Sequence, residues 1–255
     1  MKFLCLNSKP FKIVACLLLA IMVVSCAVYK SASASVYNGY TERKLPIYGV
    51  ETDKKEIAIT FDAAYGSEET LKIINILKEK NVTATFFLVG FWVEKYPDLV
   101  KTLDESGIEI GSHSSTHPYM TKLSATQMQS EIQKSVDLIK NITGKDVTLF
   151  RPPYGDYNDT LVTVCENMNI RPIQWSVDSL DWKGLTTSQM LARITPSVEN
   201  GSIILFHNNS DHIVEALPVI IDTLTEQGYK LVHVSDLIYA DNYTINNNGI
   251  QIKNK

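Results

Sequence analysis

Two histidines stand four positions apart in the stretch from Gly111 to Pro118, and this spacing could serve a metal ion. Imidazole is a common zinc ligand, and a catalytic zinc site needs two or three such donors and an open position for water. His113 and His117 follow a short β-prone run, Ile108 to Ile110, with a glycine before the pair and a proline after it. The sequence therefore places the pair in a loop after a strand. A solvent-exposed loop without a metal is the alternative.

Other polar side chains come at or just after the ends of apolar, β-prone runs, namely Asp62, Arg151, Asp178 and His207. In parallel α/β barrels the loops that follow the strands converge on one face, which carries the active site. Carboxylates, a guanidinium and imidazoles together suit metal-assisted hydrolysis, in which a metal polarises a carbonyl and separate groups act as base and acid. The sequence contains no glycine-rich phosphate loop and no Gly-x-Ser-x-Gly motif, which argues against nucleotide binding and a serine nucleophile.

The elements that must position these residues alternate between strand and helix. Runs typical of strands cover residues 56–61, 82–88, 108–112, 148–151, 172–177, 201–206 and 230–234. Patterns typical of helices cover residues 67–80, 97–105, 124–144, 159–168, 187–198 and 213–227. Alternation with short connections predicts an α/β domain with a parallel sheet. About seven such units fit a single reduced barrel better than two domains, with a doubly wound sheet as the alternative.

The composition is that of an ordinary globular protein. The chain has 255 residues, of which 45% are hydrophobic and 20% are charged, enough for one sizeable core. A formal net charge of −4 gives no electrostatic reason to expect nucleic acid as a partner. No protein partner is inferred from the sequence.

The first thirty residues differ from the rest, because lysines precede an apolar run from Ile13 to about Tyr29. This pattern predicts a signal peptide or a membrane anchor. Ala32-Ser33-Ala34 offers a cleavage site that would release the protein, and Val23-Val24-Ser25-Cys26 resembles a lipobox that would make a lipoprotein. An uncleaved segment would tether the chain to the membrane. All three outcomes make the remaining chain extracytoplasmic.

The predicted domain layout has four parts. Residues 1–30 form the signal peptide or anchor, and residues 31–45 form a linker. Residues 46–241 form the catalytic domain. Residues 242–255 form a polar tail, which we expect to be frayed.

Five ordered motifs resemble those of the polysaccharide deacetylases, the NodB-homology domains of carbohydrate esterase family 4. They are Thr60-Phe61-Asp62, His113-Ser-Ser-Thr-His117, Arg151-Pro-Pro-Tyr154, Asp178-Ser-Leu-Asp181-Trp182 and Leu205-Phe-His207. The resemblance covers about residues 50 to 240. It implies a single distorted (β/α) barrel of the NodB-homology type. It also implies hydrolysis of N-acetyl groups on peptidoglycan or chitin-like glycans, or of O-acetyl groups on xylan.

The resemblance implies catalytic roles for four residues. Asp62 would be the general base that activates the attacking water, and Arg151 would hold it ionised, since a nearby cation lowers a carboxylate pKa. His207 would be the general acid that protonates the leaving sugar amine. Asp181 would orient His207 and raise its pKa.

The same resemblance makes His113 and His117 the ligands of a divalent metal, zinc, with cobalt or nickel as alternatives. The family usually writes its first motif with a second aspartate, which completes the ligand set. This chain has Ala63 at that position, so the third protein ligand is unknown. Glu68 and the Asp62 carboxylate are candidate substitutes. Some spore-associated members of the family carry a similarly altered first motif.

Three residues are expected to bind substrate on the same grounds. The backbone N–H of Tyr154 would help to stabilise the tetrahedral oxyanion. Trp182 and Leu205 would line the groove for the acetyl methyl group and the sugar face. Simple core packing is the alternative for both side chains.

The sequence therefore predicts a metal-dependent hydrolase that removes N-acetyl groups from cell-wall amino sugars, acting on carbon–nitrogen bonds other than peptide bonds. An O-acetyl esterase of the xylan type is one alternative, and a glycan-binding module with a degenerate metal site is another. The expected partner is an acetylated cell-wall glycan, together with the membrane if the N-terminal segment is not cleaved.

Overall fold

The computed structural model describes residues 13–14, 16–25 and 43–254, and its larger compact unit begins at Lys44. Residues 13–14 and 16–25 are helical. Within these described ranges no helix is long and apolar enough to cross a membrane. The predicted lipobox cysteine, Cys26, and the predicted cleavage site at residues 32–34 lie outside the described residues. Signal peptide, lipoprotein and anchor therefore stay predictions.

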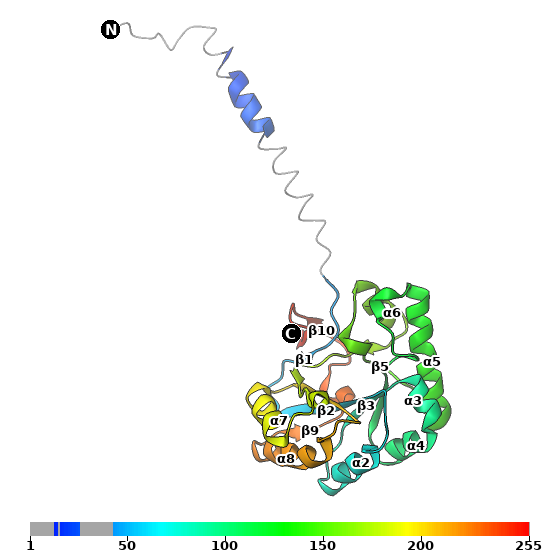
Figure 1. The fold of residues 1–255 in the computed structure, drawn as a ribbon. Coiled ribbons are helices and arrows are strands. Elements are labelled where there is room, and N and C mark those ends of the chain that lie inside the picture. The colour runs from blue at the N-terminus through cyan, green and yellow to red at the C-terminus, as the bar shows by residue number, and fades with distance from the viewer. Residues whose placement is uncertain (1–12, 15, 26–42, 255) are drawn as a thin grey trace. The chain divides into compact units, whose positions relative to one another are not determined.

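A curled sheet of parallel strands forms the centre of the larger unit, in the order β6-β5-β4-β3-β2-β8-β7 (Figure 1). Its strands are β2 (Glu56–Ala63), β3 (Thr85–Leu88), β4 (Glu109–Ser112), β5 (Leu149–Phe150), β6 (Arg171–Pro172), β7 (Val177–Asp178) and β8 (Ile203–His207). The short β9 (Lys230–Leu231) also pairs with β2. The seven strands curl into an open barrel, which confirms the predicted parallel α/β barrel.

Helices surround this sheet (Figure 1). They are α2 (Thr70–Glu79), α3 (Gly90–Lys95), α4 (Pro97–Glu105), α5 (Ala125–Thr143), α6 (Asp159–Asn167), α7 (Thr187–Ile194), α8 (Ile213–Glu226) and α9 (Val234–Leu237). Four 3-10 turns lie in the connections: η1 (Met120–Lys122), η2 (Pro153–Gly155), η3 (Asp181–Lys183) and η4 (Thr195–Ser197). The longest of these helices, α5, begins at a capping box in which Ser124 and Gln127 exchange hydrogen bonds.

Strand β2 lies between two apolar clusters, one packed against the helices and one inside the barrel. Its alternate residues point to opposite faces of the sheet. Phe61 and Ala63 are fully buried in the apolar cluster that also holds helix residues such as Ile73 and Leu217. Asp62 lies between them on the other face, where its backbone is in register with that of His207 on β8.

The predicted strand over residues 172–177 is wrong as a single element. Its first part pairs with β5 as β6, and its last part pairs with β8 as β7, at the opposite edge of the sheet. The chain crosses the opening of the barrel between them. Ile47 fills part of this opening, since its N–H donates to the carbonyl of Pro172 and its carbonyl accepts from Gln174, at 2.9 and 2.7 Å. One apolar run in the sequence therefore forms two short strands at opposite edges of the sheet.

The expected frayed tail is also wrong. Strands β10 (Tyr243–Ile245) and β11 (Ile250–Lys253) form a hairpin, and β11 pairs in parallel with β1 (Gly49–Val50). Gln251 is fully buried in this hairpin. Its side chain accepts from the backbone N–H of Tyr239 at 2.8 Å and donates to the carbonyl of Tyr239 at 3.2 Å. Buried amide hydrogen bonds of this kind fix the tail on the domain.

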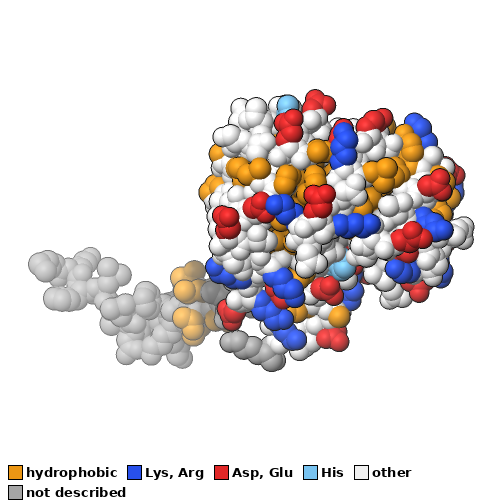
Figure 2. Space-filling view, turned by 90° about the horizontal axis from the view of Figure 1, so that it is seen from below, with side chains coloured by type: hydrophobic (Ala, Val, Ile, Leu, Met, Phe, Trp, Pro, Cys, Tyr) orange, Lys and Arg blue, Asp and Glu red, His pale blue; other side chains and the backbone are white. Residues whose placement is uncertain are grey.

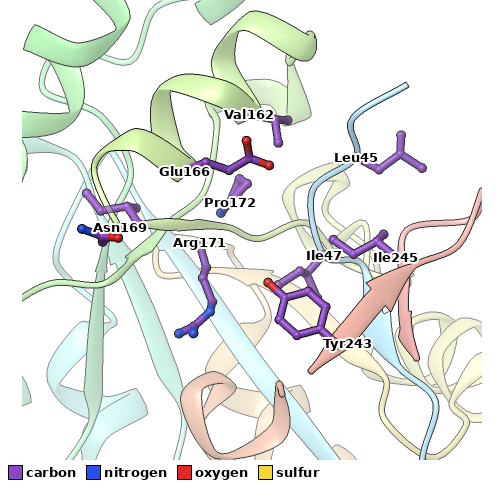
Figure 3. Close-up of a pocket in the computed structure, with 10 residues that line it drawn as sticks. Leu45, Ile47, Val162, Glu166, Asn169, Arg171, Pro172, Tyr243 and Ile245 are labelled. Atoms are coloured by element: carbon purple, nitrogen blue, oxygen red, sulfur yellow. The ribbon is translucent and has the colours of Figure 1, made fainter. Parts of the chain in front are cut away.

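The hairpin encloses a small cavity together with α6 and the segment before β1 (Figure 3). Leu45 and Ile47 come from that segment, Tyr243 and Ile245 from the hairpin, and Val162 from α6. The cavity measures about 260 Å³. It lies away from the polar residues that follow the strands, and none of the predicted site residues lines it.

On the face drawn in Figure 2, charged side chains show no clear separation of sign. Figure 2 shows one face of the molecule, on which Lys and Arg side chains are interspersed with Asp and Glu side chains. This mixture agrees with the small formal net charge of −4. Nothing on this face resembles the basic patch of a nucleic-acid-binding protein.

Gly111→Ala tests the packing that places the first histidine. A Cβ at this position in β4 would lie 2.6 Å from the Phe87 ring and 3.2 Å from the Leu149 carbonyl. Because overpacking a dense core forces strained side chains, we expect the free energy of unfolding to fall by about 1–3 kcal/mol. Chemical denaturation measures this value. The same substitution in a Phe87→Leu background should cost less, and an equal cost in both backgrounds would contradict the clash.

Candidate active site

The ends of the parallel strands open into a cavity of about 560 Å³. It is lined mostly by polar and aromatic residues, with two aliphatic ones, from six of the strand ends and the loops that follow them: Asp62, Ala64, Tyr65, His113, His117, Tyr154, Trp175, Asp178, Trp182, Leu205, His207 and Asn209. Seven of the nine residues predicted from the sequence are in this set. The other two, Arg151 and Asp181, are fully buried and hydrogen-bond to members of it.

Arg151 holds Asp62 by a buried ion pair. Its Nη1 donates to Asp62 Oδ1 at 2.9 Å and to the Thr60 hydroxyl at 2.8 Å, while its Nη2 donates to the carbonyl of Gln174 at 3.0 Å. The guanidinium lies 4.2 Å from the centre of the Phe87 ring. Both charged side chains are shielded from water, so solvent does not screen the attraction between them.

The charge state of Asp62 follows from its neighbours. Burial alone would raise the pKa of this carboxyl, but the pKa is lowered, because the charge of Arg151 and its hydrogen bond to Oδ1, together with the charge of His207, favour the ionised form. Asp62 is therefore ionised at neutral pH. Since Oδ1 accepts from Arg151, the second oxygen, Oδ2, is left beside His113, 3.5 Å from its Nε2.

His113 is buried and has a fixed tautomer. Its Nδ1 lies 2.7 Å from the backbone carbonyl of Arg151, which can only accept, so Nδ1 carries the proton. Burial lowers the pKa of His113. The ring is therefore neutral, with an unprotonated Nε2 facing the Asp62 side of the cavity. A backbone carbonyl on one ring nitrogen is also the usual partner of a metal-ligating histidine.

His117 carries an unsatisfied buried nitrogen. Its Nδ1 has no hydrogen-bond partner among the described residues. Burial is the main cause that lowers the pKa of His117 to about 4. The two imidazole rings lie 4.9 Å apart. A buried nitrogen without a partner costs free energy, and a metal ion would satisfy it.

Among the residues that the structure describes, no third protein ligand joins the two histidines. Within the described ranges, no group of three or more His, Cys, Asp or Glu side chains could hold a metal ion. Ala63 packs in the apolar cluster, and Glu68 is not among the cavity residues but accepts from the N–H of Ser67 at 2.7 Å. The residues present therefore fit a two-imidazole metal site, with Asp62 as the nearest carboxylate.

The loop between the histidines is shaped by a residue that the motifs do not contain. Ser114 and His117 adopt left-handed backbone conformations, with φ of 68° and 58°. Glu131, on α5, accepts from the backbone N–H groups of Ser115 and Thr116 at 3.0 and 2.8 Å. It also accepts from the Thr116 hydroxyl at 3.0 Å. Because Glu131 lies two turns inside a later helix, the sequence of the loop gives no sign that this carboxylate holds it.

Across the cavity, Asp181 holds His207 through two hydrogen bonds. Asp181 Oδ1 accepts from His207 Nδ1 at 2.8 Å, and Oδ2 accepts from the His207 backbone N–H at 2.7 Å. Burial alone would lower the pKa of His207, but the hydrogen bond and the charge of Asp181 outweigh it and raise the pKa. His207 therefore keeps a second proton more readily than an ordinary histidine, and its Nε2 is the nitrogen left for the cavity.

The three residues expected to bind substrate all line the cavity. Trp182 is 59% exposed, which excludes simple core packing for this side chain. Leu205 is 3% exposed and belongs to both the core and the cavity wall. Tyr154 has a left-handed backbone with φ of 59° at the centre of η2, which turns the chain into the cavity rim. Asp178 lines the cavity and also accepts from the N–H of Leu180 at 2.9 Å.

Known proteins resemble this chain in sequence and in structure. The family model for polysaccharide deacetylase matches residues 49–173. A peptidoglycan-N-acetylglucosamine deacetylase of Bacillus cereus is 35% identical over 184 residues, and the match covers 71% of this chain and 67% of that protein. The peptidoglycan-N-acetylmuramic acid deacetylase PdaC of Bacillus subtilis is 37% identical over 188 residues. That match covers 74% of this chain and 40% of PdaC, so the chain spans less than half of this relative.

The solved structures include an instructive pair. Wild-type BA3943 of Bacillus anthracis, a pseudoenzyme of carbohydrate esterase family 4, is similar with a TM-score of 0.73 and 35% identity. The match covers 75% of this chain and 68% of that one. A BA3943 mutant with restored enzymatic activity has the same TM-score at 37% identity and covers 75% of this chain and 70% of its own. By sequence and by structure, this chain belongs to the polysaccharide deacetylase family.

Proposed function

We propose that this protein is a metal-dependent N-deacetylase of acetylated amino sugars in the cell-wall glycan. The observation that carries the proposal is that one cavity is lined by a carboxylate held by an arginine, Asp62, and an imidazole held by a carboxylate, His207. Asp62 has a lowered pKa and is ionised, whereas His207 has a raised pKa and keeps a second proton more readily than an ordinary histidine. Hydrolysis of an amide needs a base to activate water and an acid to protonate the leaving amine. The names of the peptidoglycan deacetylase relatives support the substrate class.

Asp62 is the general base of the proposed reaction. Arg151 occupies Oδ1, so Oδ2 takes the proton from water as the water attacks the acetyl carbonyl. The oxyanion that develops is stabilised by the backbone N–H of Tyr154 on the cavity rim. Burial of the Asp62–Arg151 pair keeps the carboxylate in one orientation, which lowers the cost of positioning it for each turnover.

His207 is the general acid of the proposed reaction. Its Nε2 donates a proton to the amine nitrogen when the carbon–nitrogen bond breaks, and Asp181 holds the other nitrogen. Trp182 and Leu205 line the wall against which the acetyl methyl group and the sugar pack. His113 and His117 would hold the divalent metal, zinc, or cobalt or nickel instead, which as a Lewis acid would polarise the acetyl carbonyl.

The protein is proposed to act outside the cytoplasm, with its N-terminal segment as a signal peptide, lipoprotein signal or anchor.

A second candidate function has a specific observation in its favour. Among the described residues, no carboxylate joins the two histidines as a third metal ligand, and BA3943, which is similar over 75% of this chain, is a pseudoenzyme. The alternative is therefore a glycan-binding module without turnover. An O-acetyl esterase is the alternative within enzymes, because an alcohol leaving group suits the same acid and base.

Acetate release separates these functions. N-acetylated chitooligosaccharides, peptidoglycan fragments and acetylated xylan are each incubated with the full-length protein, with and without zinc or cobalt. We expect acetate from the amino sugars, with more released when metal is added. Acetate from xylan alone would favour the esterase. A protein that binds glycan but releases no acetate under any metal would contradict the enzyme.

Asp62→Asn tests the general base. The amide preserves the shape and can still accept from Arg151, but it cannot take a proton from water. We expect kcat to fall by at least about a hundredfold, the usual contribution of a general base. Zinc affinity, measured by competition with a chromophoric chelator, should change by less than about threefold. Unchanged acetate release from this variant would remove Asp62 from the role of base.

His113→Ala tests the metal site. Removal of one of only two imidazoles should weaken zinc binding by more than about a hundredfold and abolish acetate release. The measurement is the same chelator competition, with His212→Ala as the control, because His212 is not among the cavity residues. Equal zinc affinity in the His113 variant and the wild type would show that the metal binds elsewhere.

Asp181→Asn tests the acid through pH dependence. Because His207 must be protonated to act, activity is lost as pH rises through its raised pKa. Removing the carboxylate charge lowers that pKa, so the alkaline limb of kcat should move to lower pH. Asp178→Asn is the matched control, since Asp178 makes a smaller contribution to the same pKa and should produce a smaller shift. An alkaline limb that stays in place in the Asp181 variant would contradict the assignment.

A further inference from the structure

Exposed aromatic side chains gather at the cavity. Among residues 43–254, the large hydrophobic side chains that are exposed are Tyr65, Leu71, Tyr119, Tyr154, Trp182 and Val219. The four aromatic ones are each more than half exposed. Tyr65, Tyr154 and Trp182 line the cavity, and Tyr119 stacks on Tyr154. Single exposed apolar residues are ordinary, but a cluster beside a cavity indicates a binding surface.

Tyr119 extends this surface beyond the cavity. Its ring is stacked on that of Tyr154, with centroids 4.3 Å apart and an angle of 17° between the planes. The ring of Tyr154 in turn meets His117 nearly perpendicularly, with centroids 4.6 Å apart. A row of three rings thus leads from the histidine pair outward, and Tyr119 is its outer member. Tyr119 is 53% exposed and is not itself a cavity-lining residue.

The two tyrosines are held together by a contact between their loops. Tyr119 directly precedes η1, and Tyr154 lies in η2. The backbone N–H of Thr121 donates to Asp156 Oδ2 at 2.8 Å, and the Thr121 hydroxyl donates to Asp156 Oδ1 at 3.0 Å. The stacked pair is therefore ordered before any ligand arrives, which reduces the entropy lost on binding.

We propose that Tyr119 and Tyr154 form a binding site for a second sugar ring of the glycan, next to the ring that is deacetylated. A hexopyranose ring presents C–H groups on its faces and hydroxyl groups around its edge. The electron-rich face of an exposed aromatic ring suits the C–H face, while the edge stays in water. The row starts at His117, which lines the reacting cavity, and ends at the exposed ring of Tyr119, so it leads outward as a linear glycan requires. The substrate class rests on the proposed function.

Binding by oligosaccharides of different length tests this site. The ligands are N-acetylglucosamine and its β-1,4-linked tetramer, titrated calorimetrically into the full-length Asp62→Asn protein, which does not consume them. We expect the tetramer to bind more tightly than the monomer. Tyr119→Ala in this background should weaken tetramer binding by about tenfold, the upper range for one aromatic contact, and should weaken monomer binding by less. Equal losses for both sugars, or no loss, would overturn the site.

Two controls make the result specific. Tyr119→Phe keeps the ring and should retain the preference for the tetramer, so a loss as large as that of the alanine variant would overturn the stacking role. Val219→Ala removes an exposed apolar side chain on α8 and should leave both affinities unchanged. If tetramer binding depends on Tyr119 but the wild type releases no acetate, the proposed enzyme fails and the sugar site stands. If acetate is released and Tyr119→Ala binds like its parent, only the sugar site fails.

Discussion

The arrangement of the site depends on one buried residue, Arg151. Its guanidinium fixes Asp62 through Oδ1, and its backbone carbonyl fixes the tautomer of His113. One residue at the end of β5 therefore sets both the ionisation of the proposed base and the free nitrogen of a proposed metal ligand. Burying an ion pair is costly in desolvation, and the cost is offset only by good geometry and further hydrogen bonds. Thr60 and Gln174 supply those additional bonds.

The second organising feature is the separation of charge states across the cavity. The Arg151 guanidinium lowers the pKa of Asp62, and the buried Asp181 carboxylate raises the pKa of His207, so the neighbours of the two groups favour opposite charge states. Parallel strand pairing makes this separation possible, because the backbones of Asp62 and His207 are in register on adjacent strands. Near the proposed metal ligands, the residue that the family usually has as an aspartate is Ala63, which packs into the apolar core.

The sequence predicted the parts of the site that lie at strand ends, since a polar residue after an apolar run marks the active face of a parallel barrel. Asp62, His113 and His207 are found in this way. Other features depend on contacts between distant segments. The apolar run over 172–177 has the same local pattern whether it forms one strand or serves two edges. Glu131 reaches the histidine loop from a helix that the loop's own sequence does not identify.

The most direct test of this account is the protonation of its histidines, measured by nitrogen-15 NMR on the metal-free protein. At a pH near the ordinary histidine value of about 6.5, the account predicts that His207 retains protons on both ring nitrogens. It also predicts that His113 and His117 are neutral, and that His113 carries its proton on Nδ1. If His207 lost its proton at a lower pH than His117, the assignment of acid and ligand roles across the cavity would be contradicted.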